Sequence, residues 1–252
     1  MVKDCNIALF VSGNVGKEIL DFIIDNYKVD LKAIIFSDET SEIYIHLMKT
    51  GEIGKDKCFF NNDLKQNEIL QKLNNLDYFI LAWWPFIIKE PLISMPKKGI
   101  INFHPSFLPY NRGKNYNFWT IVEDCPYGVT LHFIDNTIDG GDILFQKEIN
   151  KSWTDTGETL YYKAQYEIVN LFRDSYANIR TGNFQRRKQN MKEGSFHFEK
   201  EMHSLSKIDL KKTYEVKDLL NLLRAKSFPP HPGVWFEEDG IKYEISISIK
   251  QL

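Results

Sequence analysis

Two short motifs carry side chains whose types and spacing could support chemistry. The first is NFHPSFLP at residues 102–109. Asn102 and His104 are separated by one residue, so in extended backbone their side chains point to the same side. Pro105 pushes His104 into extended geometry and, with Pro109, stiffens the turn that follows. The motif therefore predicts a carboxamide and an imidazole held together on a rigid loop.

A purely structural role is the alternative for this pair. Asn102 would then cap a turn, and His104 would form hydrogen bonds in the interior. That is common for an isolated histidine, because structural networks also perturb titrating groups. Here the neighbouring carboxamide and the two prolines favour a functional site.

The second motif is DNTIDGGD at residues 135–142, which combines three carboxylates with two glycines. Its acidic residues could suggest calcium. An EF-hand loop counted from Asp135 would place Thr137 third and Gln146 twelfth, where a bidentate glutamate is required. We therefore expect no metal site here.

The three carboxylates of this motif differ in their expected roles. A turn rich in Asp and Gly accounts for Asp135 and can also account for Asp139. Asp142 begins a new strand and can face the ligand end of the sheet. A carboxylate there would be a natural partner for His104, because it could support an imidazolium or accept a proton.

In the first half of the chain, predicted strands alternate with predicted helices, and these elements must position the two motifs. Short apolar runs predict strands, and apolar residues at helical spacing separate them. The expected strands cover residues 6–11, 31–36, 58–60, 77–83 and 99–103, and the expected helices follow residue 12 and cover 41–49 and 65–74. This order implies a largely parallel sheet with helices on both faces. A site is expected beyond the carboxyl ends of the strands, after Val11, Trp83 and Phe103.

The second half of the chain has a different pattern. It predicts helices over 115–123, 156–179 and 215–226, strands over 127–134 and 143–149, and a hairpin around Asp239-Gly240. Residues 181–206 are polar and weakly periodic, which suggests a boundary. The predicted architecture is α/β: a Rossmann-like, doubly wound domain over 1–182, a linker over 183–206, and a small C-terminal domain over 207–252 with a helix and a β-hairpin.

Composition excludes several classes of protein. The 252 residues include 32 basic and 34 acidic ones, for a net charge of -2, which removes the usual case for a nucleic-acid binder. The longest apolar stretch, 78–88, is interrupted by Pro85 and is too short to cross a bilayer. The first residues do not resemble a signal peptide, and the three cysteines have no partner spacing. We expect a cytoplasmic protein with reduced cysteines and no membrane insertion.

The loop Ser12-Gly13-Asn14-Val15-Gly16 follows a strand and opens a helix, which is where a phosphate could be held. Its two glycines do not complete a dinucleotide fingerprint, and it lacks the lysine and serine of a P-loop. For so short a motif, a tight strand-to-helix turn is the favoured explanation, and the role of the loop stays open.

Together, the motif at 102–109 with Arg112 and Gly113, and the run IDGGDI at 138–143, resemble the signature of the 10-formyltetrahydrofolate-dependent formyltransferases. That family includes enzymes acting on glycinamide ribonucleotide, on methionyl-tRNA and on amino sugars linked to nucleotides. The similar order of strands and helices extends the resemblance from residue 1 to about 180.

The resemblance implies a formyltransferase fold and a catalytic triad of Asn102, His104 and Asp142. An amine would attack the formyl carbon of the folate. Asn102 would stabilise the oxyanion, His104 would assist removal of the proton, and Asp142 would orient His104 and relay the proton. Attack by a neutral amine on an amide-like carbonyl does require an aimed donor and a base.

The implied formyl donor is 10-formyltetrahydrofolate, lying against the loop after the fourth strand and the loop before Asp142. An aromatic, apolar wall with free backbone groups suits its flat ring. Of Trp83 and Trp84, we expect one to point inward and the other toward the site. The expected folate contacts are Trp84, Phe86, Ile87, Ile88, Asp135, Ile138, Asp139, Gly140 and Gly141.

The tail segment LRAKSFPPHPG at 223–233 resembles the C-terminal part of formyltransferases that act on sugar nucleotides. This implies a nucleotide-linked amino sugar as substrate. We expect dTDP-4-amino-4,6-dideoxyglucose, in surface polysaccharide synthesis such as lipopolysaccharide O-antigen. It also implies a homodimer, for which the tail hairpin offers an exposed edge. The expected substrate contacts are Ser106, Arg112, Lys114, Tyr116, Asn117 and Arg224.

Other functions remain as alternatives. A methionyl-tRNA formyltransferase would carry a longer C-terminal barrel and basic surfaces, whereas the only tight basic cluster here is Arg186-Arg187-Lys188, which we interpret as part of a solvated linker. A glycinamide ribonucleotide formyltransferase would end soon after the long helix. A non-catalytic folate- or nucleotide-binding module on the same fold would not need a complete Asn-His-Asp set.

Overall fold

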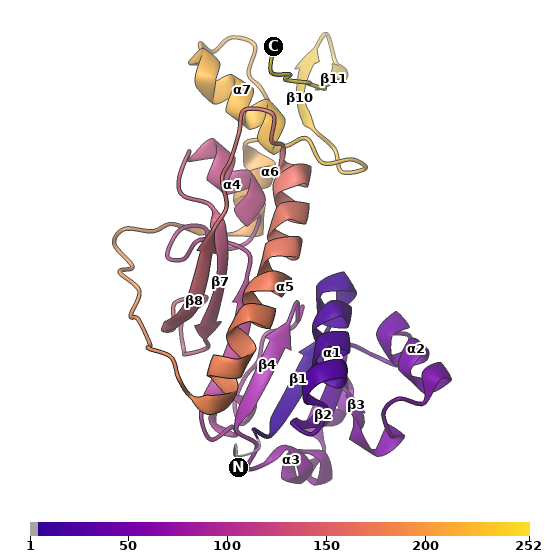
Figure 1. Ribbon diagram of the computed structural model, residues 1–252. Coiled ribbons are helices and arrows are strands. Elements are labelled where there is room, and N and C mark those ends of the chain that lie inside the picture. The colour runs from indigo at the N-terminus through magenta and orange to yellow at the C-terminus, as the bar shows by residue number, and fades with distance from the viewer. Residues whose placement is uncertain (1–4) are drawn as a thin grey trace.

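A computed structural model of the protein describes residues 5–252, so the first four residues of the predicted N-terminal domain lie outside it (Figure 1). Seven strands form one sheet in the order β3-β2-β1-β4-β5-β7-β8. The strands are β1 (Ile7–Val11), β2 (Leu31–Phe36), β3 (Cys58–Phe60), β4 (Tyr78–Ala82), β5 (Gly99–His104), β7 (Gly128–Phe133) and β8 (Ile143–Glu148). The first five in spatial order are parallel, and β7 and β8 are antiparallel to their neighbours. The expected α/β class with a mostly parallel sheet is confirmed.

Apolar side chains cover both faces of this sheet. The central strand β1 sends Leu9 into one buried cluster and Phe10 into the other, because successive residues of a strand face opposite sides. The larger cluster is covered by α1 (Gly13–Tyr27), α2 (Glu42–Thr50), α4 (Tyr116–Val122) and α5 (Gly157–Thr181), and the smaller by α3 (Asn67–Leu73) and the 3-10 turns η2 (Asn61–Lys65) and η3 (Leu92–Ser94). A further 3-10 turn, η1 (Lys55–Lys57), precedes β3.

The long helix α5 begins and ends where local signals predict. Thr156 accepts a hydrogen bond from the Thr159 amide at the start, and Gly182 adopts φ +75° at the end. Near its C-terminus, Tyr176 and Arg180 donate to the fully buried carboxylate of Asp30, with the Arg180 Nε at 2.6 Å. Because Asp30 directly precedes β2, these contacts hold the C-terminal end of α5 against the start of that strand.

Residues 183–198, which we call the strap, were predicted to be part of a solvated linker. They instead run along the outer side of β8 (Figure 1). Arg187 forms an antiparallel bridge with Ile143, and β9 (Phe196–His197) pairs in parallel with β6 (Arg112–Gly113). In the expected basic cluster, the Arg186 guanidinium stacks 3.7 Å from the centroid of the Phe133 ring. The strap is therefore packed against the domain, which its polar composition did not indicate.

The tail forms the predicted helix and hairpin at one end of the molecule (Figure 1). After the short α6 (Glu199–Ser204), the helix α7 (Val216–Ala225) packs against α4. Strands β10 (Val234–Glu238) and β11 (Ile241–Ile245) turn at Asp239 and Gly240, both with positive φ. Within residues 5–252, no helix combines the length and apolar character needed to cross a bilayer.

Candidate active site

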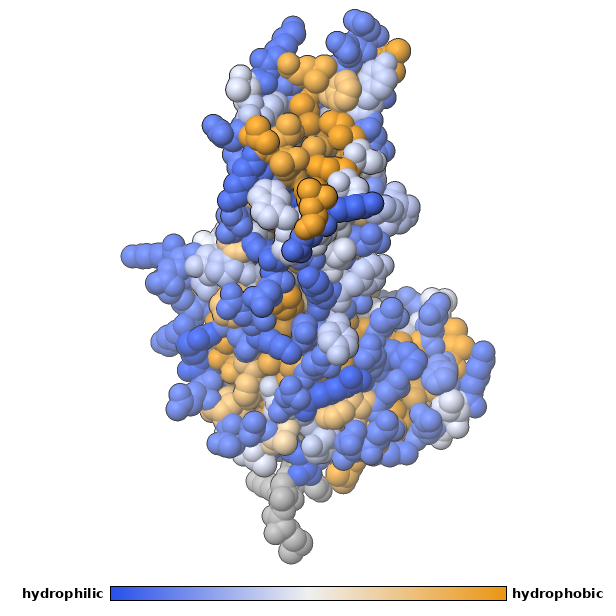
Figure 2. All heavy atoms as spheres, turned by 45° about the horizontal axis from the view of Figure 1, so that its top comes forward, coloured by the Kyte–Doolittle hydropathy of each residue, from blue (hydrophilic) through white to orange (hydrophobic). Residues whose placement is uncertain are grey.

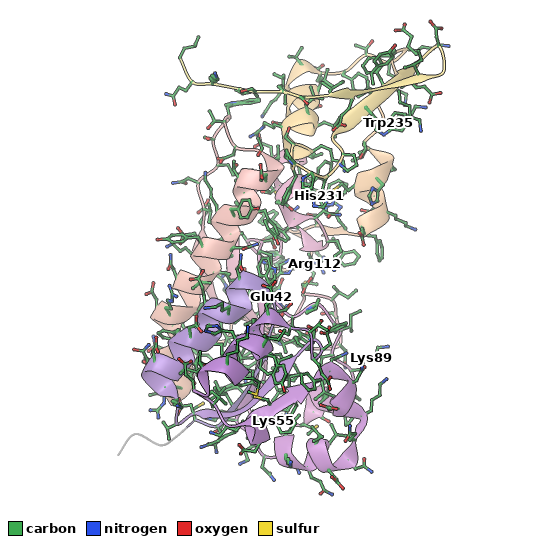
Figure 3. The ribbon with its side chains drawn as sticks, turned by 90° about the vertical axis from the view of Figure 1, so that its right-hand side faces the viewer. Glu42, Lys55, Lys89, Arg112, His231 and Trp235 are labelled. Atoms are coloured by element: carbon green, nitrogen blue, oxygen red, sulfur yellow. The ribbon has the colours of Figure 1, made fainter. Side chains whose placement is uncertain are left out.

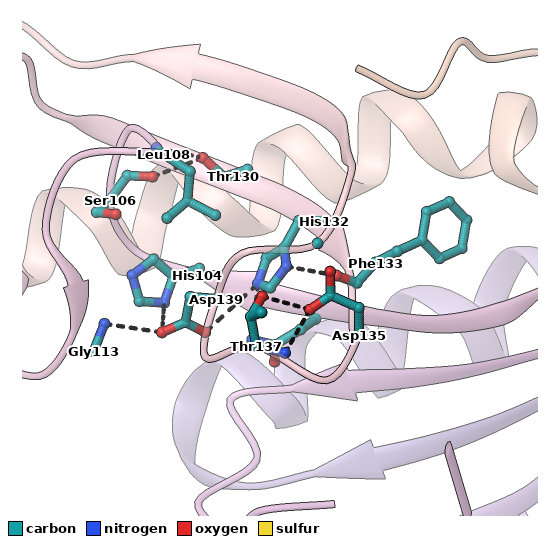
Figure 4. Close-up of polar contacts among 12 residues, drawn as sticks. His104, Ser106, Leu108, Gly113, Thr130, His132, Phe133, Asp135, Thr137 and Asp139 are labelled. Atoms are coloured by element: carbon teal, nitrogen blue, oxygen red, sulfur yellow. Dashed lines mark hydrogen bonds and ion pairs between the residues drawn. The ribbon is translucent and has the colours of Figure 1, made fainter. Parts of the chain in front are cut away.

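His104 ends β5 and is only 5% exposed. Its Nε2 lies 3.2 Å from the Asn111 carbonyl oxygen, and its Nδ1 lies 3.5 Å from Asp139 Oδ2 (Figure 4). Asn111 is fully buried in a left-handed conformation with φ +52°, and its side-chain amide donates to Glu123 and Ser195. The imidazole is thus held between two oxygen acceptors, and both of its nitrogens can donate when the ring is doubly protonated.

The carboxylate beside His104 belongs to Asp139. Its Oδ2 accepts from the Gly113 amide at 3.0 Å, and its Oδ1 lies 3.7 Å from His132 Nε2 (Figure 4). Burial alone would raise the pKa of Asp139, but His104, His132, the Gly113 amide and Arg112 together outweigh it and lower that pKa below its ordinary value. Asp139 is therefore ionised at neutral pH.

The expected pairing of Asp142 with His104 is wrong. The Asp142 carbonyl oxygen accepts from the Phe133 amide in the sheet ladder, and its carboxylate has no hydrogen bond or ion pair with any residue that the structure describes. The reason is the turn between the strands. Asp139 has φ +50°, which turns the chain so that Asp139, and not the residue at the strand entrance, faces His104.

The two glycines of this turn are needed for close packing. A Cβ on Gly141 would overlap the Phe133 carbonyl oxygen, and one on Gly140 would overlap the Thr137 hydroxyl. Asp135 is exposed and accepts from the Thr137 amide at 2.7 Å, which is the turn-forming role weighed for it from sequence. The motif therefore folds into a tight turn that places one carboxylate, that of Asp139, beside His104.

His132 belongs to the same site and was missed in the sequence. It lies opposite Asn102 in the β5–β7 ladder and is 1% exposed. Its Nδ1 donates to the Phe133 carbonyl at 2.8 Å, so its Nε2 can accept from Asn102 Nδ2 at 3.2 Å. Mainly through burial, the pKa of His132 falls to about 4, which keeps the ring neutral at pH 7. The available signal was a titratable side chain in the mostly apolar strand 128–133.

Two of the expected substrate contacts have structural roles. Ser106 is fully buried and donates its hydroxyl hydrogen to the Tyr110 carbonyl at 2.7 Å. Arg224 is 6% exposed and donates to the carbonyl oxygens of Ser152 and Asp155. Both side chains therefore stabilise backbone segments of the protein, and their contact with a substrate stays a prediction.

Two other expected contacts, Arg112 and Tyr116, and the residue Asn115, which was not expected from the sequence, are better placed for a ligand. Arg112 Nε, Asn115 Nδ2 and Tyr116 Oη are buried and have no hydrogen-bond partner in the part of the chain that the structure describes. The Tyr116 ring lies edge-on to His104, 6.3 Å between centroids. Buried polar atoms rarely lack a hydrogen-bond partner, because each unpaired atom lowers the stability of the fold by about 1–3 kcal/mol. These three atoms, on residues directly after the His104 loop, are suited to a polar ligand.

Lys114 and Asn117 flank the same segment. Lys114 is exposed, and its backbone amide donates to the His197 carbonyl at 3.1 Å. Asn117 donates its side-chain amide to the Gly157 carbonyl at 2.8 Å. The Lys114 side chain therefore remains available to a ligand.

The segment after β4 forms a partly exposed aromatic wall. Trp84 packs edge-on against Phe10 and Phe86, and its Nε1 is a further buried donor with no partner among residues 5–252. Phe86, Ile87 and Ile138 are exposed, whereas Ile88 is 8% exposed and belongs to the core. Trp83 packs on the opposite cluster beside Tyr161, so the two tryptophans do face different sides of the sheet. An apolar surface with one free donor fits the flat ring of a folate.

A cavity of about 380 Å³ adjoins this site on the side of the tail. It begins at Asn115 and Asn117 and is lined on its other sides by residues of α6, α7 and the hairpin. Its polar and aromatic lining includes His203, Lys226, Phe228, His231 and Trp235. Figure 3 shows Arg112 lying between the sheet domain and the labelled His231 and Trp235 of the tail.

The loop at Ser12 lines a second cavity of about 420 Å³ with Lys17 and His46. A Cβ on Gly16 would lie 3.0 Å from the Val11 carbonyl carbon, so this glycine is explained by the tight strand-to-helix turn. Among the described residues, no group of three or more His, Cys, Asp or Glu side chains is arranged to hold a metal ion.

Comparison with known proteins identifies two sequence families and a shared fold. The profile of the Formyl transferase family matches residues 24–173, and that of the N-formyltransferase dimerization C-terminal domain matches 201–251. A dTDP-4-amino-4,6-dideoxyglucose formyltransferase from Mycobacterium bovis is 31% identical over 137 residues, which are 54% of this chain and 58% of that protein. The chain thus aligns with less than two thirds of the length of this curated relative.

Two solved structures share the fold over nearly the whole chain. A 4-N formyltransferase from Francisella tularensis superposes with a TM-score of 0.81 at 23% identity, covering 98% of this chain and 99% of the other. An N-formyltransferase from Helicobacter canadensis, solved with folinic acid and dTDP-3-aminofucose, gives 0.73 at 23% identity over 94% and 85%. Since the first family profile covers more than half of the 252 residues, the chain belongs to the formyl transferase family.

Proposed function

We propose that the protein is an N-formyltransferase that moves a formyl group from 10-formyltetrahydrofolate to the amine of a nucleotide-linked amino sugar. The observation that carries this proposal is the meeting of Asn102, His104 and Asp139 at the carboxyl end of β5. This is the edge where open α/β sheets bind ligands. Asp139 takes the place that the sequence had suggested for Asp142.

Each of these groups has one part in the reaction. When bound, the folate supplies the formyl carbon, which becomes bonded to the amine nitrogen as its bond to the folate nitrogen breaks. Asn102, oriented by neutral His132, has a second amide hydrogen with which to stabilise the developing oxyanion. His104 takes the proton lost by the amine and can return it to the departing folate nitrogen. Ionised Asp139 stabilises the imidazolium formed in between.

The folate would lie against the wall formed by Trp84, Phe86 and Ile87, with the orphaned Trp84 indole nitrogen as one donor. Of the folate contacts expected from sequence, we retain this wall together with Ile138 and the turn at Gly140 and Gly141. Ile88 is buried in the core and contributes packing.

The amino-sugar substrate is supported by several observations. The C-terminal profile is that of N-formyltransferases. Of the relatives described above, the Mycobacterium bovis protein is a dTDP-4-amino-4,6-dideoxyglucose formyltransferase, and the Helicobacter canadensis protein was solved with dTDP-3-aminofucose. The free polar atoms of Arg112, Asn115 and Tyr116, with exposed Lys114, suit an anionic, hydroxyl-rich ligand. The 380 Å³ cavity is lined by Phe228, Trp235 and Lys226, with Glu199 as its acidic residue, and the aromatic rings and the lysine suit a nucleotide. We propose dTDP-4-amino-4,6-dideoxyglucose as the substrate.

We propose a cytoplasmic homodimer that joins through the tail and supplies formylated sugar for surface polysaccharide, such as lipopolysaccharide O-antigen. The match of residues 201–251 to a dimerization domain supports the assembly.

The test is formyl transfer by the purified chain to a panel of amines. The panel contains dTDP-4-amino-4,6-dideoxyglucose, a GDP-linked amino sugar, glycinamide ribonucleotide and charged initiator tRNA, each with 10-formyltetrahydrofolate, with and without EDTA. We expect turnover on the dTDP sugar in both conditions. Preference for the tRNA or for glycinamide ribonucleotide would reassign the substrate, and folate binding without turnover on any amine would favour a non-catalytic module.

A further inference from the structure

The strap contacts both loops that carry the proposed catalytic groups. Arg187 bridges to Ile143, immediately after the Asp139 turn. At its other end, β9 pairs with β6, which follows Asn111, the partner of His104. Because the strap is continuous from 183 to 198, it connects the two loops from outside the sheet.

Gln189 lies at the centre of this arrangement. Its Nε2 donates to the Asp139 carbonyl at 2.8 Å and to the Gly141 carbonyl at 2.7 Å. These two carbonyls flank the turn in which Asp139 adopts φ +50°. Such backbone is sparsely populated by residues other than glycine and persists when its surroundings hold it. A single side-chain nitrogen therefore closes the turn that aims the carboxylate.

The strap secures the opposite loop as well. Ser195 Oγ accepts from the Asn111 amide at 3.1 Å and donates to Glu123 at 2.8 Å. A Cβ on Gly194 would overlap the Pro109 carbonyl oxygen, so the chain passes this loop in direct contact. Asn111, which positions His104, is thus held by the same segment that holds Asp139.

We propose that Gln189 is a positioning residue for formyl transfer, acting through Asp139. This inference rests on the proposed function of the Asp139 carboxylate. The distance of 3.5 Å between His104 Nδ1 and Asp139 Oδ2 is already long for a direct hydrogen bond. If the turn moved outward by a small amount, the carboxylate would no longer stabilise the imidazolium. Gln189 limits that movement without contacting the reacting atoms.

The experiment compares Gln189→Met with Gln185→Met. Methionine is close to glutamine in size but has no N–H donors, and Gln185 is an exposed strap residue with no hydrogen bond to the described chain. We expect Gln189→Met to lower kcat about 10- to 100-fold with little change in KM, as a small misplacement of a catalytic group does. Gln185→Met should match the wild type.

Hydrogen exchange of the Gly113 amide, followed by NMR, provides a readout that needs no substrate. This amide donates to Asp139 Oδ2, so its protection reports whether the carboxylate is in place. Gln189→Met should speed its exchange, and Gln185→Met should not. Unchanged exchange in Gln189→Met, or a wild-type kcat, would overturn the proposal.

A double-mutant cycle with Asp139→Asn separates positioning from general destabilisation. If Gln189 acts through Asp139, adding Gln189→Met to Asp139→Asn should have little further effect on kcat. A full multiplicative loss would contradict the proposal. A wild-type protein inactive on every amine would refute the proposed function alone, and the Gly113 exchange would still decide whether Gln189 holds the turn.

Discussion

Asp139 lies between two imidazoles, those of His104 and His132, and the three groups differ in what they can do. Burial keeps His132 neutral, so it serves as an acceptor that orients Asn102. Attraction to His104 and Arg112 and the hydrogen bond from the Gly113 amide keep Asp139 negative, so it can stabilise a positive charge on His104. The environment of each residue, more than its type, therefore determines its part in the site.

Asp139→Asn should lower kcat by about 100-fold or more, because an amide cannot stabilise an imidazolium as a carboxylate does. Asp142→Asn is the matched control and should retain nearly full activity, since no described residue pairs with that carboxylate. Steady-state kinetics of both variants checks this. The reverse ranking would restore the role that the sequence suggested for Asp142.

The buried His132 should make the fold sensitive to mild acid. Its pKa is about 4 in the folded protein against 6.5 for a free histidine, so the unfolded chain binds more protons between these values. The contribution to stability is complete above pH 6.5 and is lost as the pH falls toward 4. We expect a loss on the order of 2 kcal/mol between pH 7.5 and pH 5, measured by urea unfolding.

The variant His132→Gln isolates this effect, because glutamine does not titrate in that range. Its free energy of unfolding should change less between pH 7.5 and pH 5 than that of the wild type. An equal pH dependence in the two proteins would show that other groups cause the acid sensitivity. Asp139 does not interfere, because its pKa is lowered and it titrates only at a more acidic pH.

At the scale of elements, the short β6–β9 pairing joins the strap to the loop after His104. It depends on Gly113, which has φ +89° and lies so close to β9 that a Cβ would overlap the His197 carbonyl oxygen. The amide of the same residue donates to Asp139. One glycine thus lets strap, loop and carboxylate come together.

Gly113→Ala should destabilise the protein more than Gly182→Ala, by at least about 1 kcal/mol in urea or thermal unfolding. Both glycines have positive φ, so the backbone strain from a Cβ is similar. Gly182 has no atom within 4 Å of an added Cβ, whereas Gly113 has the strap. Gly113→Ala should also reduce kcat. If Gly113→Ala and Gly182→Ala lowered the free energy of unfolding equally, the strap would be able to move away from the added Cβ without loss of stability.

At the scale of the whole molecule, the tail projects from the sheet domain, and apolar side chains gather at that end (Figure 2). The hairpin is two strands wide and leaves Ile241 56% and Tyr243 45% exposed. An isolated hairpin of this size is marginally stable in water and presents an unpaired edge. A second copy of the chain would cover both.

Ile241→Glu should therefore convert the proposed dimer to a monomer, measured by light scattering after size-exclusion chromatography. A charged group placed in an apolar interface has to be desolvated without a partner. Val29→Glu is the control, because Val29 is similarly exposed at 53% but lies in the sheet domain, before β2. A monomeric wild type, or a dimeric Ile241→Glu variant, would contradict assembly through this strand.

Much of the fold could be predicted from local pattern. The expected strands at 31–36 and 58–60 and the helix 156–179 match β2, β3 and α5 within two residues. The errors lie where local pattern carries little information. Residues 183–198 are polar, and two-residue strands such as β6 and β9 leave no periodicity, so the strap was mistaken for a linker.

By itself, the sequence determined the order of the elements, the family and the presence of Asn102 and His104 at the exit of one strand. These follow from apolar periodicity and from residues that are close along the chain. Tertiary structure alone decided that Asp139 and not Asp142 faces His104 and that His132 forms a hydrogen bond with Asn102. It also decided that the strap contacts both the turn at Asp139 and the loop after His104. Those outcomes depend on antiparallel pairing between distant strands and on a left-handed residue stabilised by its neighbours, neither of which local spacing reveals.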